Sequence, residues 1–296
     1  RTSSKAMLPG FVNSHCHTAS TVFRSQTDDG QGGAALYSIG FRGEGIISPD
    51  DWKILAYLGT IEMILAGYTT LNDFWYCPEV MAEISSITGM RMQLASEILD
   101  VDKSKIMDGD WSRVPKIGKD TLKFGVDFVK NYNNSNNGLI TTRLGPHAVD
   151  TCSKGLHREI HQEAKNLGVG LHCHVAQSKK EVDFINKESG LGPATFLAEL
   201  GVLGPDWVLA HLTFADSIDI RSVADCGSSN AHAATIYARR GSQAPLGEIQ
   251  AIGINCGLAS DWMINDPWEG MRVVSANLRL LEQSHKGMES IKALEF

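Results

Sequence analysis

The chain has 296 residues, of which 43% are hydrophobic and 21% charged, and its formal net charge is −7. This composition is ordinary for a soluble globular protein. An acidic chain without a dense lysine and arginine cluster lacks the basic face that a nucleic-acid partner requires. No apolar run approaches the roughly 18 residues of a membrane span, which argues against a role inside a membrane.

Short apolar runs alternate with longer helical patterns along the whole chain. This alternation is typical of βαβ units, which build a parallel sheet. Eight such units predict an α/β fold, a closed (β/α)8 TIM-type barrel, as a single domain over residues 1–296. The seventh strand is the weakest, and the segment after it is compatible with a loop. The expected strands lie at residues 7–17, 70–75, 91–98, 139–148, 168–176, 207–214, 228–234 and 254–262.

The stretch SPDDWKILAYLGTIEMILAGY, at residues 48–68, shows how the intervening helices are recognised. Ser48 or Asp50 is suited to cap the start of this helix, and Gly67 is suited to end it. Between them, four apolar side chains recur at the three- and four-residue spacing of one helix face. The stripe consists of Ile54, Leu58, Ile61 and Leu65.

Polar residues at strand ends are the candidates for chemistry, because barrels of this kind place their active sites at the carboxyl ends of the strands. His15 and His17 end the first strand. The two-residue period of a strand puts both imidazoles on one face, while Cys16 points the other way. Two nitrogen ligands in this arrangement suit a single metal cation.

Three further strands carry polar groups of the same kind. His172 and His174 repeat the spacing on the fifth strand, where one of the two is enough to reach the barrel mouth. His211 lies in the sixth strand, and Asp261 closes the eighth. A buried carboxylate without a partner is costly, and a metal would satisfy it. These ligand types predict one divalent metal ion, with zinc first and iron or cobalt as alternatives.

A metal bound at these residues would make hydroxide available at neutral pH. Asp261 can bind the metal and also take the proton from the activated water. His211, beside it, can polarise the substrate or shuttle a proton. We therefore expect Asp261 and His211 to be catalytic.

Several motifs occur together in a fixed order along the chain. LPGFVNSHCHT, GYTTLND, LGPHAVDTCS, VLAHLTF and LASDW resemble the motifs of the amidohydrolase superfamily, in its metal-dependent aminohydrolase and chlorohydrolase branch. That branch includes adenosylhomocysteine/methylthioadenosine, guanine and cytosine deaminases and the triazine hydrolases. The resemblance runs from about residue 8 to the C-terminus, and it is much more specific for the superfamily than for the substrate.

The resemblance implies roles for individual residues. On the fifth strand it selects His174, because the family's ligand stands three residues before a glutamate, and it leaves His172 deeper in the strand as packing. It places His211 near the metal-bound water and implies that His147 contacts the substrate. The implied ligands of a mononuclear metal site are His15, His17, His174 and Asp261.

Two departures from the family pattern bear on the substrate. Gln177 occupies the position of the family's glutamate, which carries protons in ring deamination. An amide can orient a substrate but cannot exchange a proton usefully at neutral pH, so we count Gln177 among the catalytic candidates in an orienting role. The segment at 230–241 also differs, and Trp262 replaces a small or polar residue. Substrate contacts are expected from His147, Gln177, Trp75, Trp262 and His232.

The family's small β-sandwich is expected to be largely absent from this chain. The sequence begins at the first strand and stops after the eighth helix, either as a fragment or with those segments omitted. Members of the branch are often homo-oligomers, so a homo-oligomer is one expected assembly beside a small-molecule substrate. Six cysteines without a CxxC pair predict reduced thiols in a cytoplasmic protein.

The sequence leaves three functions open. The first is hydrolysis of a C–N bond in a small N-heterocyclic substrate, as in the deaminases that dominate the branch. Gln177 gives weight to an alternative, hydrolysis of a C–Cl, N-alkylamine, amide, urea or carbamate bond. A different class is a non-catalytic, metal-containing binding protein, against which the retained His211 argues, because a structural metal site would not need it.

Overall fold

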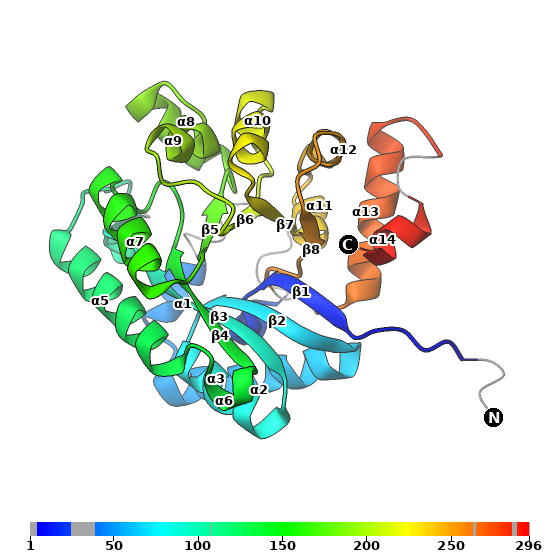
Figure 1. Cartoon of the computed structure of the whole chain (residues 1–296), viewed down its shortest axis with the longest axis horizontal. Helices are drawn as coiled ribbons and strands as arrows, with labels where there is room; N and C mark the ends of the chain where they lie inside the picture. The colour runs from blue at the N-terminus through cyan, green and yellow to red at the C-terminus, as the bar shows by residue number, and fades with distance from the viewer. Residues whose placement is uncertain (1–4, 25–38, 107, 263–264, 286–288, 296) are drawn as a thin grey trace.

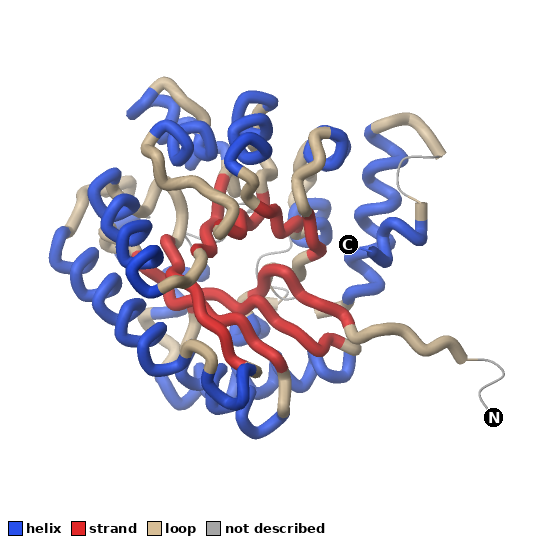
Figure 2. The backbone as a smooth tube through the Cα atoms, in the orientation of Figure 1, coloured by secondary structure: helices blue, strands red, loops and turns tan. Residues whose placement is uncertain are grey.

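The computed structural model describes residues 5–24, 39–106, 108–262, 265–285 and 289–295. Eight parallel strands lie side by side in chain order and curve into a nearly closed barrel, with helices on the outside (Figure 1). Figure 2 shows the strands as an inner ring. The predicted (β/α)8 barrel is therefore confirmed. The strands are β1 (Phe11–Cys16), β2 (Tyr68–Trp75), β3 (Arg91–Ile98), β4 (Ile140–Pro146), β5 (Leu171–Val175), β6 (Trp207–His211), β7 (Ser229–His232) and β8 (Cys256–Leu258).

Helices cover the outer face of the strands and connect each strand to the next. The segment after β7, which the sequence left compatible with a loop, contains two short helices, α11 and α12. Within the described ranges, we find no helix with the length and apolarity that crossing a membrane requires. The helices are η1 (Thr18–Phe23, 3-10), α1 (Phe41–Glu44), α2 (Pro49–Ala66), α3 (Pro78–Thr88), α4 (Lys103–Ile106), α5 (Pro115–Tyr132), α6 (Ser135–Gly138), α7 (Lys154–Leu167), α8 (Lys179–Ser189), α9 (Pro193–Glu199), α10 (Ser217–Cys226), α11 (Ala234–Arg239), α12 (Leu246–Ala251), α13 (Pro267–Leu281) and α14 (Ser290–Glu295).

The barrel closes between its first and last strands at one end only. β8 is three residues long, and the chain beyond it reaches β1 through a parallel bridge between Cys16 and Asp261. The Asp261 amide donates to the His15 carbonyl at 3.0 Å, and the His17 amide donates to the Asp261 carbonyl at 3.2 Å. Closure therefore brings the carboxylate of Asp261 to the carboxyl end of β1, beside both histidines.

Helix α2 has the predicted ends but an unexpected orientation. The Ser48 hydroxyl accepts a hydrogen bond from the Asp51 amide, and Gly67 ends the helix with a φ of 95°. Its apolar stripe faces outward, whereas a barrel helix ordinarily turns such a stripe to the core. Apart from Met63, the buried residues of α2 are small, and η1 packs very close to Gly59. A Cβ on Gly59 would lie 2.0 Å from the Thr18 carbonyl oxygen.

Candidate metal centre and substrate pocket

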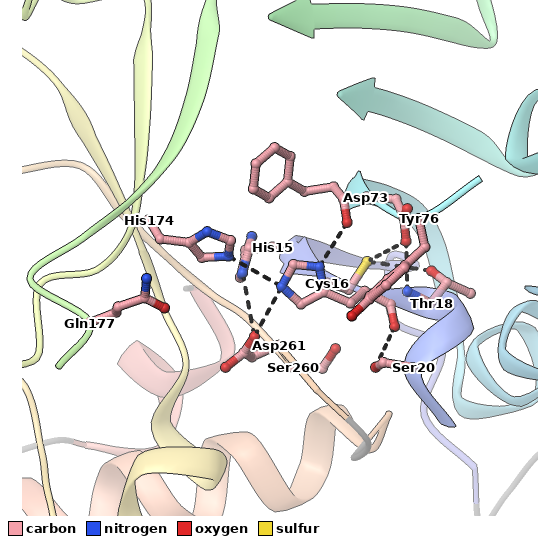
Figure 3. A network of polar contacts seen from close by, with 12 residues as sticks. His15, Cys16, Thr18, Ser20, Asp73, Tyr76, His174, Gln177, Ser260 and Asp261 are labelled. Carbon is pink, nitrogen blue, oxygen red and sulfur yellow. Dashed lines mark hydrogen bonds and ion pairs between the residues drawn. The ribbon is translucent and has the colours of Figure 1, made fainter. Parts of the chain in front are cut away.

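Three imidazoles and one carboxylate converge at the carboxyl end of the barrel (Figure 3). The Asp261 Oδ1 atom lies 3.5 Å from His15 Nε2 and 3.4 Å from His17 Nε2. His17 Nε2 and His174 Nε2 are 3.2 Å apart. Ligands about 2.1 Å from a tetrahedral zinc ion are separated by roughly 3.4 Å from one another. These three separations are therefore those of neighbouring ligands in one metal coordination shell.

The second ring nitrogen of each histidine fixes which nitrogen faces the centre. His17 Nδ1 lies 2.7 Å from the Phe74 carbonyl oxygen, and His174 Nδ1 lies 2.5 Å from the His147 carbonyl oxygen. A carbonyl oxygen can only accept, so both Nδ1 atoms carry the proton and both Nε2 atoms present a lone pair. Among the described residues, His15 Nε2 is buried and has no hydrogen-bond partner. This orphaned nitrogen fits a metal.

His172 has a direct part in this arrangement. Its Nε2 atom lies 2.9 Å from His15 Nδ1, and both side chains are fully buried. For His15 to present the lone pair of Nε2, its Nδ1 must donate and His172 Nε2 must accept. The expectation that His172 only packs in the strand is therefore wrong, because the residue holds a metal-facing histidine in place.

Burial sets the charges of the centre. Desolvation lowers the pKa of His15 to about 4 and that of His211 to about 3. It also lowers the pKa of His174 well below its usual value, so His15, His174 and His211 are neutral at pH 7. Burial raises the pKa of Asp261, but nearby His211 and the close approach of His15 and His17 outweigh this effect, and the pKa lies well below normal. Neutral imidazoles with an ionised carboxylate are a suitable donor set for zinc.

The backbone is strained where the strands reach the centre. Trp75, Ala176, His211 and Asp261 have φ values of 95°, 51°, 86° and 56°. Residues other than glycine rarely adopt positive φ values, and each such residue costs about 1–3 kcal/mol in backbone strain. The four residues lie at or just after the ends of β2, β5, β6 and β8, so the strain is concentrated at the barrel mouth.

A small pocket opens over the metal-binding atoms. The predicted substrate contacts Trp75, Gln177 and Trp262 line it. Tyr237 and Arg240 line it as well. Both lie in the divergent segment at 230–241, of which only His232 was predicted as a substrate contact. The full lining is His17, Trp75, His174, Gln177, His211, Tyr237, Arg240, Asp261 and Trp262.

The backbone of Gln177 is held on both sides. Its amide donates to Glu181 Oε2 at 2.7 Å, and its carbonyl accepts from the Tyr237 hydroxyl at 2.9 Å. The other oxygen of Glu181 accepts from the Ala176 amide at 3.1 Å. These bonds fix the backbone at Gln177, and its side chain faces the centre (Figure 3).

The structure places the remaining two predicted substrate contacts outside the pocket lining. The His147 ring lies 5.1 Å from that of His174 and 4.7 Å from that of Trp75, between centroids. Its Nε2 is buried 3.9 Å from Glu97 Oε1 and, among the described residues, has no hydrogen-bond partner. His232 ends β7 with its side chain buried, and its carbonyl accepts from the Ala259 amide. Of the two, His147 lies against a predicted metal ligand, His174.

The chain is similar to known deaminases. A 5-methylthioadenosine/S-adenosylhomocysteine deaminase of Dictyoglomus thermophilum is 28% identical, over 97% of this chain and 64% of its own length. A relative of the same name from Desulfitobacterium hafniense is 31% identical, over 86% of this chain and 56% of its own length. The chain thus spans less than two thirds of the curated relatives it matches.

Solved structures share the fold. An adenosine deaminase from Xanthomonas campestris with bound zinc superimposes with a TM-score of 0.82 over 97% of this chain and 64% of its own, at 20% identity. The sequence pattern of the amidohydrolase family matches residues 6–296. The linked motifs predicted this relationship, and the match confirms it: the chain belongs to the amidohydrolase family.

Proposed function

We propose that this chain is the catalytic barrel of a metal-dependent hydrolase that cleaves a C–N bond of a small N-heterocyclic substrate. The observation that carries the proposal is the convergence of His15, His17 and His174 with the Asp261 carboxylate at separations of 3.2–3.5 Å. The deaminase names of the relatives support the reaction class.

Zinc is the proposed metal, with iron or cobalt as alternatives, and its ligands would be His15, His17, His174 and Asp261. The bound zinc of the X. campestris deaminase supports this choice. When bound, such a metal supplies Lewis-acid activation of water at neutral pH. A reducing, cytoplasmic compartment is proposed as well, since all six cysteines are free.

Asp261 and His211 are the proposed proton carriers. The ionised Asp261 directs Oδ1 toward His15 and His17, and its second carboxylate oxygen can accept a proton. The His211 ring stacks on that of His174 at 5.2 Å and is neutral. A neutral imidazole carries both a donor and an acceptor, so His211 can accept a proton from the attacking water at one nitrogen and then deliver a proton to a leaving group.

Trp75 and Trp262 would hold a flat ring between apolar walls. Gln177 can donate to a ring nitrogen and accept from an exocyclic amine, but it cannot transfer a proton. Protonation of the ring therefore has to come from His211 or Asp261. This favours a second candidate function at the same centre, the hydrolysis of C–Cl, N-alkylamine, amide, urea or carbamate bonds, whose reacting groups need less ring protonation.

A substrate screen tests the proposal. The purified, zinc-loaded chain is incubated with adenosine derivatives, guanine, cytosine, chlorinated triazines and simple ureas, and the release of ammonia, chloride and alkylamine is scored separately. Ammonia release from the ring amine of adenosine derivatives, guanine or cytosine identifies the deaminase. Chloride or alkylamine release, or ammonia release from a urea, identifies the second candidate. Tight metal binding with no turnover would instead support a non-catalytic binding protein.

Gln177→Glu separates the two enzymatic candidates. A deaminase should gain or keep activity, because a carboxyl group at this position restores a proton carrier worth roughly 10²-fold or more in rate. Gln177→Met, which removes hydrogen bonding at similar size, is the matched control. A collapse with both variants would show that the amide orients a substrate that needs no ring protonation.

A further inference from the structure

The outer surface of α2 carries an apolar seam, made up of Ile54, Leu58, Ile61 and Leu65. The helix lies on the outside of the barrel (Figure 1). The exposed fractions of the four residues are 65%, 48%, 51% and 83%. Together with Ile64 they expose apolar surface on the order of 500 Å², the size of the largest apolar patch on a typical monomer, which is often functional.

The spacing of the seam is that of a helix that packs against another helix. Intervals of four, three and four residues are those of a coiled-coil stripe, which keeps its side chains along one line of the helix. Residues 54–61 contain no charged side chain. The inner face of α2 is already occupied by η1, so the seam is available for a second helix.

The seam is also its own complement. Ile54 and Leu65 are equally far from its midpoint, and so are Leu58 and Ile61. An antiparallel copy of α2 would therefore set Ile54 against Leu65 and Leu58 against Ile61, twice over. A two-fold interface requires this property, because each residue must meet the same partner from both sides.

The charges beside the seam do not oppose such a contact. Lys53 pairs with Glu83 at 3.0 Å, and Glu62 pairs with Arg24 at 2.5 Å, each within one chain. Neither pair brings an uncompensated charge to the seam. A stable interface buries roughly 800 Å² on each partner, so the seam would supply most of the contact, with a rim of polar residues around it.

We propose that two copies of this chain associate through α2, which forms an antiparallel pair with the α2 helix of the second copy. The two-fold axis of this dimer lies at the level of the helix midway between Leu58 and Ile61. The apolar stripe that does not face the barrel then faces a second barrel. The metal centres do not take part in this contact.

The oligomeric state of the 296-residue chain tests the proposal. Sedimentation velocity over a micromolar concentration series should show a dimer. Ile61→Lys places an unpaired ammonium in the seam and should weaken the dimer on the order of 100-fold or more. The matched control is Ile218→Lys on α10, where the isoleucine is 65% exposed and lies off the seam, and it should leave the dimer intact. Circular dichroism establishes that each variant is folded.

A double variant tests the antiparallel register. Leu58→Glu combined with Ile61→Lys sets opposite charges against each other across the axis, so it should dimerise more tightly than Ile61→Lys alone. The proposal is overturned if the wild-type chain stays monomeric, since a different segment or partner then covers the seam. It is equally overturned if a wild-type dimer survives Ile61→Lys, or if Ile218→Lys disrupts it as strongly.

Discussion

β1 and β5 carry the same His-Cys-His trio, and the barrel uses the two trios differently. In a barrel of this type, alternate strands contribute side chains to the same interior layers, so residues of the first and fifth strands meet across the centre. His15 faces His172 in the lower layer at 2.9 Å, and His17 faces His174 in the upper layer at 3.2 Å. The two trios therefore form two histidine pairs, one above the other.

The layers differ in what the ring nitrogens do. In the upper layer, both Nδ1 atoms are held by backbone carbonyls and both Nε2 atoms face the metal-binding point. In the lower layer, His15 directs its Nε2 atom toward the same point, while the Nε2 atom of His172 accepts a hydrogen bond from His15 Nδ1. Closure of the barrel accounts for this difference. The bridge between Cys16 and Asp261 places the Asp261 carboxylate beside His15, so the candidate metal centre lies on the side of β1.

The largest effect is expected in the upper layer. His17→Ala and His174→Ala each remove one of four ligands, and structural zinc sites are worth roughly 10–16 kcal/mol in all. Each change should thus lower zinc affinity on the order of 10²–10³-fold, which metal analysis after dialysis against a chelator measures. Equal losses at the two positions support the layer assignment. Full zinc retention by either variant would contradict it.

An intermediate effect is expected in the lower layer at β5. His172→Phe removes the acceptor for His15 Nδ1 while filling the space, and loss of such a partner costs about 10–100-fold in metal affinity. His172→Gln offers an amide oxygen as the acceptor and should recover part of that affinity. Competition with a chromogenic chelator measures both variants. If they bind zinc as the wild type does, His172 only packs.

The fold could be predicted from the sequence almost completely, because alternation of strand and helix patterns is a local signal. β3 lies at the predicted residues 91–98, and even the short β7 lies inside its predicted range. The direction of the α2 stripe could not be predicted in this way. It depends on the close approach of η1 to Gly59, a contact between segments about 40 residues apart in the chain.

The candidate site was predictable in its ligands and less so in its surroundings. Strand period alone leaves His172 and His174 equivalent, because both face the interior, and only the family's motif spacing separates them. The hydrogen bond from His15 to His172 depends on how strands at opposite sides of the barrel are staggered. Tyr237 and Arg240 come from a six-residue helix and its C-cap, too short to show a periodic pattern.

The smallest effect is expected at the cysteines in the middle of the trios. Burial raises the pKa of both the Cys16 and the Cys173 thiol well above normal, so both are neutral thiols. Cys16→Ala and Cys173→Ala should each lower the free energy of unfolding by about 1–2 kcal/mol and leave zinc affinity within about twofold of the wild type. Thermal denaturation and chelator competition measure the two quantities.

Cys16→Ala should be the more destabilising of the two changes. Its Sγ atom lies 3.7 Å from Asp73 Oδ2, and that carboxylate also accepts from the Thr18 amide and so holds the turn that follows β1. Cys173 makes only a contact of 3.3 Å with the His174 carbonyl oxygen. A tenfold loss of zinc affinity in Cys173→Ala would place its sulfur inside the barrel. The alternation that assigns His172 and His174 to one face would then be broken on β5.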